Sequence, residues 1–459
     1  MTSRSTLVQG ADFPLALENR DRIPAERYYD PDFFALEAER LWPRVWQMAC
    51  RLEELPTVGD WVEYSCLGRS VIVTRVAPDR IKAYHNACRH RGMQIVQGRG
   101  HAPTGFTCPF HGWCWDLEGR NRAVFAPDVF DPKLLEPDDI HLAEVRLEVW
   151  GGCAWINFDD EAPALRPSLE PFATYHDALG VERMRTESWL VTDLPVNWKL
   201  ASEAFLEGYH AEQTHPQLLA RSVQRGYSAG SDTMGFTDPD DIIGSSIYFM
   251  KVLSEGMGGG MVHTRDIEAA EAISDMSLPS DPLEALGLWT TRLNEEIGRR
   301  ARDRGVNLPD LNALIATGHI SSVNFCFPHF WYLPVYGNAA SYRIRPIGPE
   351  QTRFEVWTTT HLPADTDHVS PQEPTEMAHD DPRWGEVLRQ DFANLPRQQA
   401  GVRSPGFASM RLARDVEGTI GNFHCAVDGY LARRAHTDLL PAIQLVSGPI
   451  DAALRDLGL

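Results

Sequence analysis

Hydrophobic positions change their spacing near residue 59. From about 59 to 158, apolar residues come in short alternating runs, for example over 61–64, 71–76 and 149–156, and glycine and proline separate the runs. A period of two is typical of strands, because successive side chains point to opposite faces of a sheet. The pattern therefore predicts an all-β domain in this part of the chain.

The segments on either side follow helical spacing more often. Apolar and aromatic residues over 31–46 predict a short helix that enters a domain, and we expect it to pack on the C-terminal part of the chain. Two later segments, over 384–399 and 412–434, also predict helices.

Strands return later in the chain. Alternating runs over 340–345 and 353–358 flank the turn sequence Gly348-Pro349-Glu350 and predict a pair of strands. The glycines at 256–260 lack the GxGxxG spacing of a nucleotide cradle, so we interpret them as a flexible loop.

Length and charge restrict the possible functions. A chain of 459 residues with 43% hydrophobic content can bury a large core and divide into two domains. Lys and Arg number 43 against 64 Asp and Glu, which gives a net charge of −21. This charge would repel phosphate backbones and anionic lipids, so we expect neither a nucleic-acid nor a membrane partner.

Cysteine usage and the N-terminus point to a reducing compartment. The chain has eight cysteines, of which Cys88 and Cys108 are candidate metal ligands, and the scattered spacing of the other six predicts reduced thiols. Residues 1–14 are polar without the apolar core of a signal peptide, and no stretch approaches the roughly 18 apolar residues that a membrane span needs. A cytoplasmic protein is the expectation.

The first chemical motif lies in the predicted β domain. Cys88 and His90 are followed, after 17 residues, by Cys108 and His111. Two thiolates and two imidazoles can close a four-ligand site for zinc, or for a Rieske [2Fe-2S] cluster in which two histidines replace two cysteines on one iron. The ligand count alone does not separate these alternatives.

The neighbouring residues favour the cluster. Glycines at 92, 112 and 119 and tryptophans at 113 and 115 suit two tight, shielded loops. The sequences CRHRG (88–92) and CPFHGWCWDLEG (108–119) resemble the two cluster-binding loops of Rieske iron-sulfur proteins. The resemblance implies that Cys88 and Cys108 bind one iron, and that His90 and His111 bind the other near the surface.

Three further candidates near this motif do not fit its spacing. His85 and His101 flank the loops, and we expect them on the surface or in loops. Cys114 lies within the second loop but matches no ligand position, so we expect a packed thiol.

The second motif lies in the C-terminal part of the chain. Residues 197–210 predict a helix in which Glu203, Glu207 and His210, at i, i+4 and i+7, share one face. His215 precedes Pro216, where the helix should stop and the ring could turn back toward the same metal. Two imidazoles and a carboxylate form the facial triad of non-haem iron oxygenases, which leaves positions open for oxygen.

This segment resembles the mononuclear-iron helix of the large (α) subunits of Rieske non-haem iron aromatic-ring-hydroxylating oxygenases. The resemblance implies that His210 and His215 bind iron and that a carboxylate ligand comes from a distant helix. Asp391 is the best match for that carboxylate, although Asp380 and Asp381 lie nearby. The alternative for Asp391 is an ordinary solvated acid on a helix face.

The resemblance also implies how electrons move. Glu207 matches an acidic bridge, often Asp in the family, between a cluster histidine and an iron histidine, here His111 and His210. A head-to-tail homotrimer would place the cluster of one subunit beside the iron of its neighbour. No flavin, nicotinamide or plant-type ferredoxin motif is evident, so we expect a separate ferredoxin or flavin reductase that uses NAD(P)H. β subunits are possible.

The expected architecture is α+β, with an all-β Rieske domain and a larger catalytic domain whose antiparallel sheet is flanked by helices in a helix-grip-like arrangement. We place an N-terminal helical segment at 1–43, the Rieske domain at 44–158 and the mononuclear iron domain at 159–459. The expected cofactors are one [2Fe-2S] cluster and one mononuclear Fe(II) per subunit.

The preferred function is hydroxylation of an aromatic or related cyclic compound with O2. The alternatives are monooxygenation that removes O- or N-methyl groups, including those of quaternary amines, a cluster-only electron-transfer protein, and a zinc-stabilised binding module. Several residues could line a substrate pocket, although ordinary core packing also explains them: Phe205, Leu206, Asn324, Phe325, Phe327, His329, Phe330 and Trp331.

Overall fold

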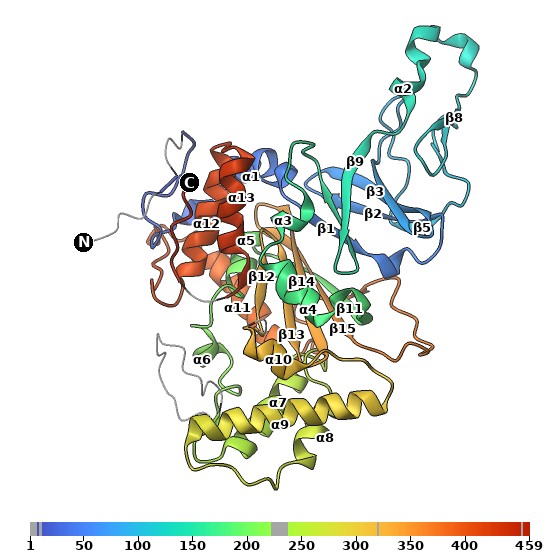
Figure 1. Cartoon of the computed structure of the whole chain (residues 1–459). Helices are drawn as coiled ribbons and strands as arrows, with labels where there is room; N and C mark the ends of the chain where they lie inside the picture. The colour runs from blue at the N-terminus through green and yellow to red at the C-terminus, as the bar shows by residue number, and fades with distance from the viewer. Residues whose placement is uncertain (1–6, 9–11, 222–236, 319–320, 451–452) are drawn as a thin grey trace. The chain divides into compact units, whose positions relative to one another are not determined.

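The chain divides into two compact units. The computed structural model describes residues 7–8, 12–221, 237–318, 321–450 and 453–459 (Figure 1). One unit comprises Trp42–Arg166, and the other combines Met1–Leu41 with Pro167–Leu459. The larger unit is therefore built from both ends of the chain.

The unit Trp42–Arg166 contains a seven-stranded antiparallel sheet in the order β1-β10-β9-β4-β3-β2-β5, and a three-stranded sheet in the order β6-β7-β8. The strands are β1 (Gln47–Arg51), β2 (Asp60–Cys66), β3 (Arg69–Ala77), β4 (Arg80–His85), β5 (Arg99–His101), β6 (Phe106–Thr107), β7 (Cys114–Trp115), β8 (Asn121–Ala123), β9 (Glu144–Trp150) and β10 (Cys153–Asn157).

A two-residue turn sets the register of the β2–β3 hairpin. Cys66 pairs with Arg69, and the two residues between them, Leu67 and Gly68, have φ values of 50° and 76°. Two positive φ values in a two-residue loop match the right-handed twist of the flanking strands. The alternation seen in the sequence therefore becomes a paired, twisted sheet, which confirms the predicted β domain.

The larger unit contains a second seven-stranded sheet, in the order β16-β11-β15-β14-β13-β12-β17. All its pairs are antiparallel except β11 with β16. The strands are β11 (Arg185–Leu194), β12 (Asn324–Cys326), β13 (Phe330–Val335), β14 (Asn338–Gly348), β15 (Gln351–Thr360), β16 (Thr375–Glu376) and β17 (Gly448–Pro449). The predicted strand pair at 340–358 is confirmed as β14 and β15.

Helices accompany this sheet, as predicted for an α+β domain. They are α1 (Pro31–Arg40), α4 (Phe172–Leu179), α5 (Trp198–Glu203), α6 (Ala211–Thr214), α7 (Ile242–Gly256), α8 (Thr264–Ala272), α9 (Pro282–Asp303), α10 (Leu311–Ala316), α11 (Glu386–Val402), α12 (Gly418–Leu431) and α13 (His436–Val446). Helix α9 packs on α7 and α8 around the buried Trp289 (Figure 1). Short elements complete the fold: η1 (Ala25–Tyr28), η2 (Trp42–Arg44), η3 (Leu52–Glu54), η4 (Pro127–Val129), η5 (Pro132–Leu135), η6 (Val181–Arg183), α2 (Pro137–Ile140) and α3 (Leu165–Ser168).

Two predicted helices are too long. The helix predicted over 31–46 ends at Arg40, and the chain continues into η2, which contains Pro43. The helix predicted over 412–434 begins only at Gly418. The backbone amides of Met410 and Leu412 instead donate to the carbonyls of Ile23 and Asp21, at 2.8 and 2.9 Å. Bonding to this N-terminal segment accounts for the position of Leu412, the first residue of the predicted helix, outside a helix.

The cysteines and the helix lengths were also subjects of prediction from the sequence. None of the eight cysteines forms a disulfide, which agrees with the prediction of reduced thiols for the six that are not candidate metal ligands. Within the described parts of the chain, every helix is too short or too polar to cross a lipid bilayer.

Candidate functional site

The first cluster loop is a tight turn closed by two backbone hydrogen bonds. The amide of Cys88 donates to the carbonyl of Met93 at 2.8 Å, and the amide of Gly92 donates to the carbonyl of Cys88 at 2.9 Å. Gly92 has a φ of 75°, a conformation that side-chain-bearing residues rarely adopt. The loop thus requires glycine four residues after the cysteine.

The second loop repeats this arrangement. The amide of Cys108 donates to the carbonyl of Trp113 at 2.8 Å, and the amide of Gly112 donates to the carbonyl of Cys108 at 3.0 Å. Gly112 has a φ of 70°. Two loops with the same backbone bonds therefore present one cysteine and one histidine each.

The four side chains of the motif converge between these loops. Cys88 and Cys108 are buried, and burial together with the neighbouring Cys108 raises the pKa of the Cys88 thiol. The rings of His90 and His111 lie 4.7 Å apart between centroids and are half-buried. The structure therefore brings together all four predicted cluster residues.

An orphaned nitrogen tests whether these residues fit a cluster. Nδ1 of His90 is buried and has no hydrogen-bond partner among the described residues. A buried polar atom without a partner is costly, whereas coordination to a metal would satisfy it. Two buried thiols and this imidazole thus fit a group bound by sulfur and nitrogen.

Aromatic rings enclose the histidines. The ring of Trp113 stacks on His90 with centroids 5.2 Å apart and an interplanar angle of 6°. Phe130 contacts His90 edge-on at 5.6 Å, and Phe110 lies 3.8 Å from His111. These contacts limit water at the site while the histidines stay partly exposed.

The other residues near the motif lie outside this constellation. His85 and His101 are exposed at the ends of strands β4 and β5, and Nδ1 of His101 lies 2.8 Å from Asp60. They are on the surface, as expected, but in strands and not in loops. The Cys114 thiol is half-buried and donates to the carbonyl of Gly112 at 3.2 Å.

In the larger unit, His210, His215 and Asp391 gather their ligand atoms within 4.8 Å of one another. Nε2 of His215 lies 3.0 Å from Oδ1 of Asp391, and Nε2 of His210 lies 3.7 Å from the same oxygen. Asp391 is buried on helix α11, whereas Asp380 is exposed and Asp381 binds Arg383 at 2.7 Å. Of these three carboxylates, only Asp391 belongs to the group.

Hydrogen bonds orient both imidazoles. Nδ1 of His210 lies 2.7 Å from Oε1 of Glu207, and Nδ1 of His215 lies 2.7 Å from Oε1 of Gln390. Because both oxygens can only accept, each Nδ1 carries the proton and each Nε2 keeps its lone pair for a metal. Burial alone would lower the pKa of His210, but its hydrogen bond to Glu207 and the charges of Glu207 and Asp391 raise it overall.

The single helix predicted over 197–210 is wrong. Helix α5 ends at Glu203, and α6 begins at Ala211. Glu207 accepts the backbone amide of His210 through Oε2 at 3.0 Å, in addition to its bond with the ring. In a continuous helix, the amide of His210 would donate to a backbone carbonyl of the preceding turn. Here it donates to the side chain of Glu207 instead.

A cavity of about 180 Å³ adjoins this group of ligands. His210 and Asp391 line it together with three glutamates, Glu203, Glu207 and Glu417. Burial raises the pKa of Glu417, and the charge of Glu207 raises it further. The walls also include apolar side chains, among them those of Leu395, Met410, Leu412 and Ile420.

Two family models match the chain in the places where the two sites lie. The Rieske [2Fe-2S] domain matches residues 45–131, and the ring-hydroxylating alpha subunit (catalytic domain) matches residues 181–433, which is more than half of the chain. The chain belongs to the Rieske non-haem iron oxygenases, as a large (α) subunit. Its cofactors are those of the family, a [2Fe-2S] cluster and a non-haem iron.

Curated relatives of this Rieske oxygenase include enzymes with different substrates. The carnitine monooxygenase oxygenase subunit of Escherichia coli (strain K12) is 31% identical over 202 residues, which cover 42% of this chain and 52% of that protein. The biphenyl 2,3-dioxygenase subunit alpha of Rhodococcus jostii (strain RHA1) is 31% identical over 206 residues, or 43% and 44% of the two chains. The chain spans about half the length of the curated relatives that it matches.

Solved structures share the fold over nearly the full length. A quaternary ammonium Rieske monooxygenase in complex with L-carnitine has a TM-score of 0.57 at 18% identity, and the match covers 90% of this chain and 97% of that one. Naphthalene 1,2-dioxygenase from Rhodococcus sp. has a TM-score of 0.56 at 19% identity, with 90% and 95% covered. These matches support the predicted α+β fold with its Rieske and catalytic domains.

Seven of the eight residues expected to line a substrate pocket are buried in the core of the oxygenase, and the eighth, Phe205, is half-buried. None of these eight residues is among the described residues that line the cavity. Phe325 and Trp331 are fully buried with ring centroids 4.6 Å apart, and Phe205 contacts Tyr342 at 5.0 Å. Core packing, the alternative reading, explains their apolar character.

Sequence patterns did not reveal Gln390, which binds the ring of His215, or Glu417, which lines the cavity. Gln390 directly precedes Asp391, yet its role depends on a contact with His215 that is 175 residues away in sequence. Glu417 reaches the cavity from the segment before α12, which was predicted to be helical. Neither residue belongs to a recognisable local motif.

Replacing Glu207 with glutamine should weaken iron binding at His210 without unfolding the protein. Glutamine keeps the shape of the side chain but loses the charge that favours an electron-rich imidazole. Mutation of a group that is hydrogen-bonded to a metal ligand typically lowers metal affinity by about 10- to 100-fold. Titration of the iron-depleted protein against a competing chelator measures this change. Glu212→Gln, at an exposed position in α6, is the matched control and should retain wild-type affinity.

Proposed function

We propose that this chain is the terminal oxygenase component of a Rieske system, which uses O2 and electrons from a partner protein to oxygenate a small organic molecule. The observation that carries the proposal is the convergence of His210 Nε2, His215 Nε2 and Asp391 Oδ1 beside a cavity. Two imidazoles and a carboxylate on one side of an iron leave open positions for oxygen and substrate.

Each residue has a defined part in this proposal. His210, His215 and Asp391 would hold the iron, and when bound this iron supplies the site at which O2 is activated. Glu207 and Gln390 hold the two rings in the tautomer that coordinates through Nε2. Cys88, Cys108, His90 and His111 would hold the cluster that stores one electron at a time.

Electron delivery requires partners. We propose a ferredoxin or flavin reductase that uses NAD(P)H as the donor, and a homotrimer in which Glu207 lies between His210 and His111 of a neighbouring subunit. A ring of this kind closes by rotation. The cluster of each subunit then lies beside the iron of one neighbour, and its own iron lies beside the cluster of the other neighbour. The two oxygens of Glu207 accept hydrogen bonds from Nδ1 and the backbone amide of His210, and a carboxylate has further lone pairs for a second imidazole.

Hydroxylation of an aromatic or cyclic compound is the first candidate reaction. It agrees with the curated relatives that are named as dioxygenases of biphenyl and of anthranilate. Aromatic rings are nonetheless missing from the described lining of the cavity.

Monooxygenation of an N-methylated or quaternary amine is the second candidate. The cavity lining carries the carboxyl groups of Glu207 and Glu417, without a lysine or arginine among the described residues that line it. Carboxylates favour a cationic guest. Curated relatives named as carnitine and glycine betaine monooxygenases are similar to this chain.

Product analysis with ¹⁸O-labelled dioxygen separates these candidates. The holoprotein with a surrogate reductase would be offered a panel of aromatic compounds and of methylated ammonium compounds. Dioxygenation places both labelled atoms in one product, whereas monooxygenation places one in the product and one in water. Turnover of neither panel, in a protein that contains both iron sites, would contradict the proposed substrates.

A further inference from the structure

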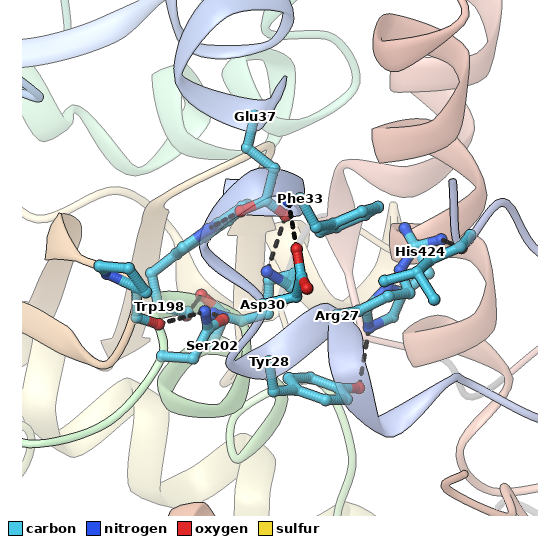
Figure 2. A network of polar contacts seen from close by, with 12 residues as sticks. Arg27, Tyr28, Asp30, Phe33, Glu37, Trp198, Ser202 and His424 are labelled. Atoms are coloured by element: carbon cyan, nitrogen blue, oxygen red, sulfur yellow. Dashed lines mark hydrogen bonds and ion pairs between the residues drawn. The ribbon is translucent and has the colours of Figure 1, made fainter. Parts of the chain in front are cut away.

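Three buried side chains meet at the edge of the cavity. Oη of Tyr28 lies 2.9 Å from Oε1 of Glu203 and 3.0 Å from Nε2 of His424, and this nitrogen lies 2.7 Å from the same carboxyl oxygen. Figure 2 shows Tyr28 on η1 and His424 on α12 approaching each other. Tyr28 and His424 are fully buried, whereas Glu203 also lines the cavity. We call Tyr28, Glu203 and His424 the buried triad.

The tautomer of His424 follows from its surroundings. Nδ1 of His424 is buried and has no partner among the described residues, whereas Nε2 contacts both other members of the triad. Burial, with the charges of Arg27 and Lys199, lowers the pKa of His424, so the ring is neutral. An N–H left without an acceptor costs more than an unused lone pair, so the proton belongs on Nε2. His424 therefore donates to Glu203.

A count of charges decides the state of Glu203. Lys199 pairs with Glu37 at 2.7 Å, and Arg27 pairs with Asp428 at 2.6 Å, with all four side chains buried. Within each pair the two charges cancel. Glu203 is the third buried carboxyl of this group, and among the described ion pairs no lysine or arginine pairs with it. An unpaired buried charge is unfavourable, so the neutral acid is the preferred form.

The other groups around Glu203 agree with this count. Burial raises the pKa of Glu203 to about 8, although the hydrogen bond from Tyr28 and the charges of Lys199 and Arg27 lower it. Glu417 raises it further, and Glu207 and Asp391 face the same cavity. Glu203 can thus hold a proton at neutral pH and release it without a large energetic cost.

We infer that the buried triad is a proton reservoir that opens into the iron cavity, and that Glu203 donates its proton to an oxygen atom being reduced there. This inference rests on the proposed function. Inserting one oxygen atom of O2 and reducing the other to water consumes two electrons and two protons, and the electrons come from the partner protein. Glu203 lies on the cavity wall and is positioned to supply one of these protons.

The step is balanced as a proton transfer. The O–H bond of Glu203 breaks, and its proton passes to the oxygen atom as that atom accepts electrons. The resulting carboxylate accepts hydrogen bonds from Oη–H of Tyr28 and Nε2–H of His424. Water in the cavity then returns a proton to Glu203. Tyr28 and His424 are positioning residues, since they act through Glu203.

Infrared spectroscopy of the full-length protein tests the stored proton. The wild-type protein should show the carbonyl band of a protonated carboxylic acid near neutral pH, with a loss of intensity as the pH rises through about 8. Glu203→Gln should remove this band. Asp266→Asn is the control, because burial also raises the pKa of Asp266 at a site outside the cavity. The Glu203 band should survive in that variant.

A second variant keeps Glu203 in place. Tyr28→Phe removes one hydrogen bond to the carboxylate, and this bond lowers the pKa of Glu203. The midpoint of the infrared titration should therefore move upward by about one pH unit. A purely structural role for Tyr28 would not move the midpoint.

Proton delivery is tested by mixing the dithionite-reduced holoprotein with air-saturated buffer and following the reoxidation of its metal centres. In the wild type, the rate should fall as the pH rises above about 8. In Glu203→Gln, the rate should be lower by about 10²-fold and independent of pH in this range. Asp266→Asn should keep the wild-type profile.

Two results would overturn the inference. One is the absence of a Glu203-dependent carboxylic acid band near neutral pH, and the other is a wild-type rate and pH profile in Glu203→Gln. A wild-type protein that shows the band but binds no mononuclear iron would instead contradict the proposed function. The two failures are therefore distinguishable.

Discussion

Replacing His210 with alanine is expected to remove the mononuclear iron and to leave the [2Fe-2S] cluster intact. His210 Nε2 lies 3.7 Å from Asp391 Oδ1, and alanine deletes one of only two imidazoles in the candidate triad. A facial site reduced to one histidine and one carboxylate should not retain Fe(II) against a chelator. We expect oxygenation to fall by roughly 10³-fold or more.

Metal analysis and electron paramagnetic resonance measure the two effects separately. The cluster signal should keep its wild-type shape and intensity, because His210 and the cluster loops belong to different units of the chain. His379→Ala is the control, since this histidine precedes α11 and is not among the described residues that line the cavity. Full mononuclear iron and full activity in the His210 variant would refute its assignment as a ligand.

Replacing Cys108 with serine should remove the [2Fe-2S] cluster and leave the mononuclear iron in place. The Cys108 thiol is buried between the two loops, and a serine hydroxyl does not replace a thiolate as a ligand to the cluster iron. The protein should lose labile sulfide and the visible colour of the cluster, while the mononuclear iron remains. Turnover with an external electron donor should fall by roughly 10³-fold or more, since no electron is stored.

Cys114→Ser is a closely matched control for this experiment. Cys114 lies in the same loop, yet its thiol donates to the carbonyl of Gly112 at 3.2 Å. A hydroxyl can make the same bond, so the cluster and the turnover should be unchanged. Loss of the cluster in Cys114→Ser, with retention in Cys108→Ser, would reverse the assignment of ligands.

The cluster loops could be predicted from sequence because their information is local. All four candidate ligands lie between residues 88 and 111, and the glycine four residues after each cysteine meets a local backbone requirement. The strands were predictable for a similar reason. In β2 and β3, the alternation of side chains and a two-residue turn specify the pairing without distant contacts.

Hydrogen bonds outside the regular helical pattern explain what the sequence did not reveal. Between α5 and α6, the side chain of Glu207 accepts the backbone amide of His210. Leu412, the first residue of the helix predicted over 412–434, lies outside a helix, and its amide donates to the carbonyl of Asp21. Helical periodicity carries no signal for either event, since neither hydrogen bond belongs to the regular helical pattern.

The buried triad was also beyond the reach of sequence patterns. Tyr28 and His424 are 396 residues apart in sequence, and Glu203 was expected only as one of three polar residues on a helix face. Its contacts give it a different environment, buried and close to two ion pairs. The sequence thus predicted the metal-binding chemistry, while the residues that tune it became visible only in the fold.

We expect one chain to supply two separate sets of iron ligands. Anomalous diffraction at the iron absorption edge, from crystals of the purified protein, locates both sets in one experiment. We expect one strong peak between the Cys88 and Cys108 loops and a second, weaker peak among His210, His215 and Asp391. A zinc signal between the loops, or no iron at the second position in active protein, would contradict the account.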